Sequence, residues 1–216
     1  MLERERERVA TVARRLAQNG LVVGTAGNVS ERGGEYVAIT PTGAALEELA
    51  PEDIAVVDRD GEQHSGHLAP TSELDLHLGV YHRYAAGAVV HTHSPVATSL
   101  SCVLDELPVI HYQMLMLGGA VRVAPYATFG SAALAELTLD ALEERTAALM
   151  ANHGAIVFAQ EVNEAFRNAE LLEWACTVYW RAATLGPPRT LDRDQQTAVV
   201  SAAVERGYGQ ARRIDA

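Results

Sequence analysis

The sequence predicts a single α/β domain in which helices and short strands pack in layers. Its 216 residues are enough for one well-filled core, and its apolar content of 48% and charged content of 21% are ordinary for a globular protein. Helical and strand-like patterns follow one another in mixed order, and no repeat, low-complexity tract or linker interrupts them. We therefore expect residues 1–216 to form one domain.

The helices are predicted from apolar spacing and from start and stop signals. They are expected at residues 2–18, 73–84, from Pro95 onward, and at 131–144, 162–185 and 192–206. Short strands are expected at residues 36–40, 54–58, 88–93, 147–151 and 155–159. Turn formers fill residues 24–30, and residues 63–70 are expected to be a polar loop.

Composition argues against several classes of function. The net charge of −11 disfavours a nucleic-acid partner, which needs a basic face. No run of about 18 apolar residues suggests a membrane span, and the charged first residues do not resemble a secretory signal. The two cysteines, Cys102 and Cys176, cannot build a disulfide framework, so we expect a cytoplasmic protein.

Three histidines and one carboxylate form a candidate metal site. His91 and His93 stand two residues apart in a predicted strand and would face the same side, although an isolated pair of this kind is more often simply solvated. His153 lies between two predicted strands. Glu73, in the first turn of a helix with Thr71 or Ser72 as its N-cap, would ordinarily only complement the helix dipole. Together the four match a catalytic zinc site.

Three small polar turns form a candidate phosphate site. They offer hydroxyls and backbone N–H groups, and a helix N-terminus with such groups binds phosphate without a lysine. The residues are Gly27, Asn28, Thr42, Gly43, Thr71 and Ser72. All 17 basic residues are arginines, which excludes a lysine-imine mechanism.

Taken in order, these segments resemble the class II aldolase and adducin family. The resemblance covers almost the whole chain and rests on GTAGNVS at 24–30, ITPTG at 39–43, TSE at 71–73, VVHTH at 89–93, IHY at 110–112, GG at 118–119, APYATFG at 124–130 and NHG at 152–154. It implies a three-layer α/β/α fold with a central mixed, largely antiparallel sheet. It also implies a homotetramer with active sites between subunits.

The resemblance further implies a role for each site residue. One zinc ion per subunit would be held by His91, His93, His153 and Glu73, and Glu73 would also be the catalytic acid/base. The phosphate would lie in the candidate phosphate site. Tyr112 would reach in from the neighbouring subunit to the aldehyde oxygen. Phe129 and Tyr208 would shape the aldehyde end.

The implied reaction is reversible aldol cleavage of a ketose 1-phosphate, similar to L-fuculose 1-phosphate, to dihydroxyacetone phosphate and a small aldehyde such as lactaldehyde. 5-Deoxyribulose 1-phosphate is an alternative substrate, and a dehydratase, a decarboxylase or an epimerase is an alternative enzyme. Epimerases of the family carry Asp where this chain has Glu73. A more remote alternative is a non-enzymatic scaffold similar to adducin, which would lack the metal-binding residues. His77 and His82 are expected on the solvated or interface side of their helix.

Overall fold

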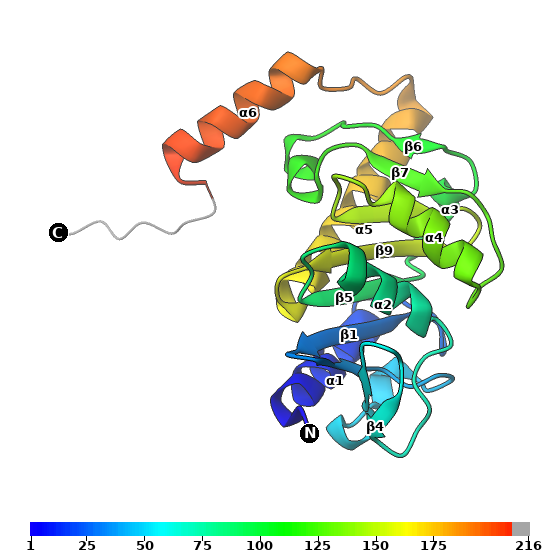
Figure 1. The fold of residues 1–216 in the computed structure, drawn as a ribbon. Coiled ribbons are helices and arrows are strands. Elements are labelled where there is room, and N and C mark those ends of the chain that lie inside the picture. Colours follow the sequence, from blue (N-terminus) through cyan, green and yellow to red (C-terminus); the bar gives the residue numbers. More distant parts are fainter. Residues whose placement is uncertain (209–216) are drawn as a thin grey trace.

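The computed structural model describes residues 1–208, in which nine strands form one sheet (Figure 1). The strands are β1 (Asn28–Gly33), β2 (Tyr36–Ile39), β3 (Ala55–Asp58), β4 (Gln63–Ser65), β5 (Ala88–Thr92), β6 (Glu106–Leu107), β7 (Val121–Ala124), β8 (Ala147–Met150) and β9 (Gly154–Ala159). Their order in the sheet is β4-β3-β2-β1-β5-β9-β8-β7-β6. All neighbours are antiparallel except β7 and β8. The mixed, largely antiparallel sheet is confirmed.

Helices cover both faces of this sheet and complete three layers. They are α1 (Glu3–Gln18), α2 (Leu74–Arg83), α3 (Pro95–Ser101), α4 (Ala132–Ala141), α5 (Val162–Leu185) and α6 (Arg193–Arg206), with the short 3-10 helices η1 (Leu46–Glu48), η2 (Pro51–Asp53) and η3 (Tyr112–Leu117). Helices α1, α3 and α5 share one apolar cluster on one face, and α2 and α4 share another on the opposite face. The predicted α/β/α arrangement is therefore confirmed.

The central strand β5 is apolar without alternation because both of its faces are buried. Val90 packs into the cluster that contains α1, α3 and α5, whereas Val89 packs into the cluster that contains α2 and α4. Successive side chains of a strand point to opposite faces, so each face contributes its own helix contacts. This burial holds the strand that carries His91 rigidly in the middle of the sheet.

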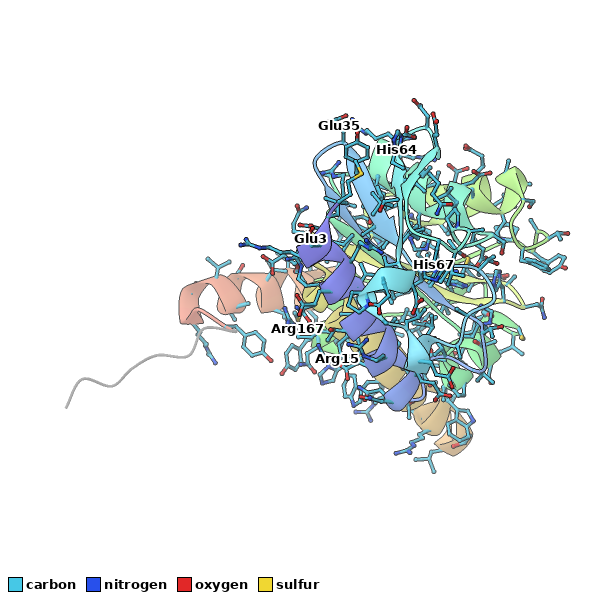
Figure 2. All side chains as sticks on the ribbon, turned by 90° about the horizontal axis from the view of Figure 1, so that it is seen from below. Glu3, Arg15, Glu35, His64, His67 and Arg167 are labelled. Carbon is cyan, nitrogen blue, oxygen red and sulfur yellow. The ribbon has the colours of Figure 1, made fainter. Side chains whose placement is uncertain are left out.

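Helix α1 illustrates how the apolar spacing becomes packing. Val9, Val12, Ala13 and Leu16 recur at helical spacing and are all buried against the sheet. Full burial of each larger side chain contributes about 1.5–3 kcal/mol to folding. Figure 2 shows α1 lying along the body with its charged residues Glu3 and Arg15 labelled.

Helix α6 differs from the others because none of its residues is buried. It begins with a capping box in which Asp192 and Gln195 bond each other's backbone N–H groups, and its inner side meets η3. Both figures show α6 projecting away from the body of the molecule. Within residues 1–208, no helix combines the length and apolar character required to cross a membrane.

The structure corrects three local predictions. Strand β1 begins at Asn28, inside a segment expected to be a turn, because pairing with β2 on one side and β5 on the other outweighs local turn preference. Residues 63–65 form edge strand β4 rather than loop. Helix α2 begins at Leu74, so Glu73 occupies the N-cap position that was predicted for Thr71 or Ser72.

Candidate metal centre and anion cavity

Three histidines converge at one end of the paired strands β5 and β9. His91 lies in β5 opposite Ile156, and His93 follows directly after this strand. His153 lies in the tight connection between β8 and β9, where Asn152 adopts a φ of 55°. The ring centroids of the three histidines are 4.7 to 4.9 Å apart. The structure thus brings together imidazoles that lie up to 62 positions apart in the sequence.

Hydrogen bonding orients the most buried of these rings. His91 is fully buried, and its Nδ1 lies 2.9 Å from the backbone carbonyl oxygen of Ala155. A carbonyl can only accept, so Nδ1 carries the proton and donates it. When His91 is neutral, its Nε2 lone pair then faces the cluster, where the Nε2 of His93 lies 2.9 Å away.

Glu73 completes the group from the N-cap of α2. Its Oε2 lies 3.2 Å from His91 Nε2, and its Oε1 lies 3.4 Å from His153 Nε2. Within residues 1–208, Oε1 is buried and accepts no hydrogen bond. A tetrahedron with metal–ligand distances of about 2.0–2.1 Å has edges of about 3.4 Å. The spacing of these donors and the unpaired oxygen therefore fit a divalent cation with nitrogen and oxygen ligands.

The protonation states of Glu73 and the three histidines also fit a bound divalent cation. Burial disfavours the ionised form of Glu73, but His91 and the Asn28 amide outweigh this effect and hold the pKa of Glu73 well below its usual range. Burial, with a contribution from the nearby His91, lowers the pKa of His93 to about 3 and that of His153 to about 4, whereas the burial of His91 is outweighed by Glu73, which raises the pKa of His91. The anionic carboxylate and the neutral His93 and His153 are in the protonation states that bind metal, and a metal would replace the proton that Glu73 favours on His91.

A cavity of about 400 Å³ opens beside this cluster. Glu73, His93 and His153 line one part of it. The remaining lining includes all the residues of the candidate phosphate site, which are Gly27, Asn28, Thr42, Gly43, Thr71 and Ser72. Phe129 also lines it, together with Thr25, Ala26, Tyr126 and Asn152, which the sequence analysis did not single out. Thr25 and Ala26 belong to the GTAGNVS block, Tyr126 to APYATFG and Asn152 to NHG. The sequence blocks that indicated the site therefore also contain these four residues.

The cavity offers hydrogen-bond donors, and its lining residues include no arginine or lysine. Thr71 Oγ1 accepts from the side-chain amide of Asn28 at 3.1 Å and from the backbone N–H of Glu73 at 3.3 Å. Because both lone pairs are used, the hydroxyl hydrogen of Thr71 is left to donate to an anion. An anion here would depend on hydroxyls, backbone amides and the neighbouring metal centre.

Gly27 permits the close approach of this loop to the sheet. It has a φ of 85°, and a Cβ added to it would lie 2.6 Å from the Val22 side chain and 3.0 Å from the carbonyl oxygen of His91. A larger residue would therefore be strained in its backbone and would also press against β5. The glycine places Asn28 next to the metal centre.

Two predicted site residues do not reach the cavity within this chain. Tyr112 and Tyr208 lie in an apolar groove between η3 and α6, with their hydroxyl oxygens 3.2 Å apart. Neither lines the cavity beside Glu73, whereas Phe129 does. The single chain therefore contains the metal and anion residues together and keeps the two tyrosines elsewhere.

His77 is the functional candidate that sequence reasoning placed wrongly. It was expected on the solvated or interface side of α2, but it is fully buried and bonds both Ser30 and Asn28. Burial is the main reason that its pKa falls to about 3. The spacing could have indicated this position, because residue 77 lies one helical turn beyond Glu73 and therefore on the same side of the helix. His82 is exposed, in agreement with the prediction.

Comparisons with known proteins agree with this architecture. Residues 7–180 match the class II aldolase and adducin N-terminal domain. A 5-deoxy-D-ribulose 1-phosphate aldolase of Bacillus thuringiensis serovar kurstaki is 38% identical over 97% of this chain and 99% of its own length. The L-fuculose phosphate aldolase of Escherichia coli K12 is 37% identical over 84% of this chain and 85% of its own.

A solved structure is similar over nearly the whole fold. It is an L-fuculose 1-phosphate aldolase that superimposes with a TM-score of 0.89 and 33% identity, covering 92% of this chain and 95% of that one. The family match, the sequence relatives and the shared three-layer fold lead to one assignment. The chain belongs to the class II aldolase and adducin family.

Proposed function

We propose that this chain is a zinc-dependent aldolase that reversibly cleaves a ketose 1-phosphate to dihydroxyacetone phosphate and a small aldehyde such as lactaldehyde. The observation that carries the proposal is the buried Oε1 of Glu73, which accepts no hydrogen bond within residues 1–208 and lies 3.4 Å from His153 Nε2 beside a cavity of amides and hydroxyls. On this proposal, residues 1–216 act as one catalytic domain in the cytoplasm.

The metal centre would consist of His91, His93, His153 and Glu73 with one zinc ion per subunit. When bound, the ion would supply Lewis-acid stabilisation of the negative charge that develops next to the substrate ketone. Without such help, a proton on the carbon beside a ketone is too weakly acidic for a carboxylate to remove. The nitrogen-rich donor set favours zinc over calcium or magnesium, which prefer oxygen ligands.

Glu73 would move the proton at C3 of dihydroxyacetone phosphate. In the synthetic direction its carboxylate takes this proton, and in the cleavage direction it returns the proton to C3 after the C3–C4 bond breaks. The position of Glu73 supports both roles, because its carboxylate lies within reach of two imidazoles and also lines the cavity.

The phosphate would bind in the other part of the cavity, at Gly27, Asn28, Thr42, Gly43, Thr71 and Ser72. The free hydroxyl hydrogen of Thr71 and the backbone of the Gly27 turn support this role. Binding energy from the phosphate would hold C3 in line with Glu73, which lowers the barrier without direct contact with the breaking bond.

The aldehyde end would be completed by a neighbouring subunit in a homotetramer. Tyr112, which lies outside the cavity of its own chain, would serve the adjacent cavity and exchange a proton with the C4 oxygen. Phe129, at the cavity, and Tyr208 would shape the space around the aldehyde. A head-to-tail contact between identical subunits generates a ring when the rotation closes, and each subunit can then contribute to its neighbour's site.

Two substrates share the dihydroxyacetone phosphate half and differ at the aldehyde. An L-fuculose 1-phosphate-like ketose would release lactaldehyde, and 5-deoxyribulose 1-phosphate would release acetaldehyde. The relative from B. thuringiensis, whose similarity extends over 97% of this chain, supports the second. Glu73 favours an aldolase over a family epimerase, which carries Asp at this position.

The test is a synthesis assay with the zinc-loaded protein. Dihydroxyacetone phosphate is incubated with acetaldehyde or lactaldehyde, and the ketose phosphates are identified by mass spectrometry and NMR. We expect a new ketose 1-phosphate that disappears when zinc is chelated, and the ratio of kcat/KM for the two aldehydes would identify the preferred substrate. If the protein binds stoichiometric zinc but forms no ketose phosphate, the proposal is contradicted. If the protein binds no zinc, the result indicates a non-enzymatic scaffold.

A further inference from the structure

We propose that His77 is a positioning residue that fixes the orientation of the Asn28 amide and, through it, the carboxylate of Glu73. The inference deepens the proposed function, on which the role of Glu73 rests. It arises from a buried chain of polar side chains behind the metal centre that connects α2 with β1 and contains none of the three imidazoles of the centre.

The chain of hydrogen bonds is continuous over five side chains. The Tyr81 hydroxyl lies 2.7 Å from Ser30 Oγ, and Ser30 Oγ lies 2.7 Å from His77 Nδ1. His77 Nε2 then contacts Asn28 Oδ1. The Asn28 amide nitrogen ends the chain 2.9 Å from Glu73 Oε2. All five residues are buried.

Glu73 sets the direction of every bond in this chain. An ionised carboxylate can only accept, so the –NH₂ group of Asn28 must face Glu73 and its Oδ1 must face His77. His77 Nε2 therefore donates, and in the neutral ring Nδ1 must accept from Ser30. Ser30 is then left to accept from Tyr81. One tautomer of His77 satisfies the whole chain.

The reverse orientation of Asn28 would harm the metal centre directly. With His77 protonated on Nδ1, Asn28 would turn its oxygen towards the Glu73 carboxylate, and two acceptors would face each other without a proton. The Glu73 carboxylate contacts the side chains of His91 and His153. Among the other residues of 1–208, Asn28 alone donates a side-chain hydrogen bond to it. His77 thus controls the group that holds the Glu73 carboxylate in place.

The test compares His77→Phe, which removes the donor, with His77→Gln, which retains an N–H at similar reach. His82→Phe is the matched control, since His82 is exposed on the same helix. Zinc affinity is measured by chelator competition. At saturating zinc, kcat and KM are measured for proton exchange at C3 of dihydroxyacetone phosphate.

We expect His77→Phe to weaken zinc binding or kcat by about 10–100-fold, the range typical of residues that orient metal ligands, and His77→Gln to recover most of the loss. A double-mutant cycle adds the Asn28→Ala background. There, His77→Phe should change kcat by no more than about twofold if His77 acts through Asn28. A lower melting temperature with zinc affinity and kcat like those of the wild type, or additive losses in the cycle, would overturn the proposal.

A third measurement does not depend on activity or on a disruptive variant. ¹⁵N NMR of histidine-labelled, zinc-loaded wild-type protein, assigned by comparison with His77→Gln, reports which ring nitrogen of His77 carries the proton. We expect protonated Nε2 and unprotonated Nδ1, and the opposite tautomer would overturn the inference. If the wild-type protein exchanged no substrate proton, the proposed function would fail, while zinc affinity and tautomer would still decide the role of His77.

Discussion

Asn28 joins the two parts of the site, because its side-chain amide donates to Glu73 Oε2 at 2.9 Å and to Thr71 Oγ1 at 3.1 Å. Its backbone also pairs with that of His91 across strands β1 and β5. One residue therefore contacts the anion cavity, the candidate base and the strand of a candidate metal ligand. Substitutions in the candidate phosphate site should consequently also affect the candidate metal centre.

Removal of one imidazole tests the metal centre. His153→Ala should lose stoichiometric zinc and nearly all cleavage activity, because it removes one of the three imidazoles and leaves only two beside the carboxylate. Zinc is measured by elemental analysis after dialysis. His82→Ala is the control, since His82 is exposed and belongs to no cluster of possible metal ligands within residues 1–208, and it should leave both quantities unchanged. Full zinc occupancy in His153→Ala would exclude His153 as a ligand.

Neutralising the carboxylate separates metal binding from proton transfer. Glu73→Gln should retain zinc on the three histidines but lower proton exchange at C3 of dihydroxyacetone phosphate by about 10²–10⁴-fold, the usual contribution of a general base. Exchange is followed by loss of deuterium into solvent. An exchange rate equal to that of the wild type would show that Glu73 is not the catalytic base.

Two glycines distinguish steric crowding from backbone strain. Gly27→Ala and Gly24→Ala both place a side chain at positive φ, but only at Gly27 would the new Cβ meet neighbouring atoms. We expect Gly27→Ala to reduce the free energy of unfolding by about 1–3 kcal/mol more than Gly24→Ala does and to raise KM for dihydroxyacetone phosphate. Urea unfolding and steady-state kinetics measure the two effects, and equal losses would show that crowding is unimportant.

A shared active site predicts complementation between inactive variants. In tetramers assembled from equal amounts of Glu73→Gln and Tyr112→Phe subunits, about one quarter of the sites would combine an intact Glu73 with an intact Tyr112 from the neighbour. Activity should then approach that fraction of wild type, far above either parent variant. Mixed oligomers with no more activity than the parents would place Tyr112 outside the neighbouring site.

The buried His77 predicts a specific sensitivity to acid. Its pKa is about 3 in the folded protein and about 6.5 when unfolded, so the unfolded state binds the extra proton as the pH falls. The stabilising contribution is present above pH 6.5 and is lost progressively towards pH 3. From about pH 7.5 to about pH 5, wild type should lose about 2 kcal/mol more stability than His77→Gln.

Urea unfolding at one protein concentration, with zinc chelated, measures this difference. The other histidines are common to both proteins, so their contributions cancel in the comparison. His82→Gln serves as the control and should follow wild type. Parallel pH profiles for wild type and His77→Gln would show that His77 is not held neutral by burial.

Local sequence was sufficient for most helices and for strands β2, β3, β5, β8 and β9. Helix α5 occurs at its predicted bounds, Val162–Leu185, because a long helical period is visible without tertiary context. The sequence blocks around His91 and His153 likewise predicted a shared metal site, although the two residues are far apart in the chain. Strand β1 could not be found in this way, since its stability comes from pairing with two distant strands.

By itself, the sequence determined the α/β class, the candidate metal residues and the family resemblance, because periodicity and residue chemistry are local properties of the chain. Only the tertiary structure decided that Glu73 turns away from helix capping towards two histidines, and that His77 is enclosed behind it. Those outcomes depend on the packing of α2 against β1 and β5. Contacts of this kind join residues distant in sequence, so no local pattern specifies them.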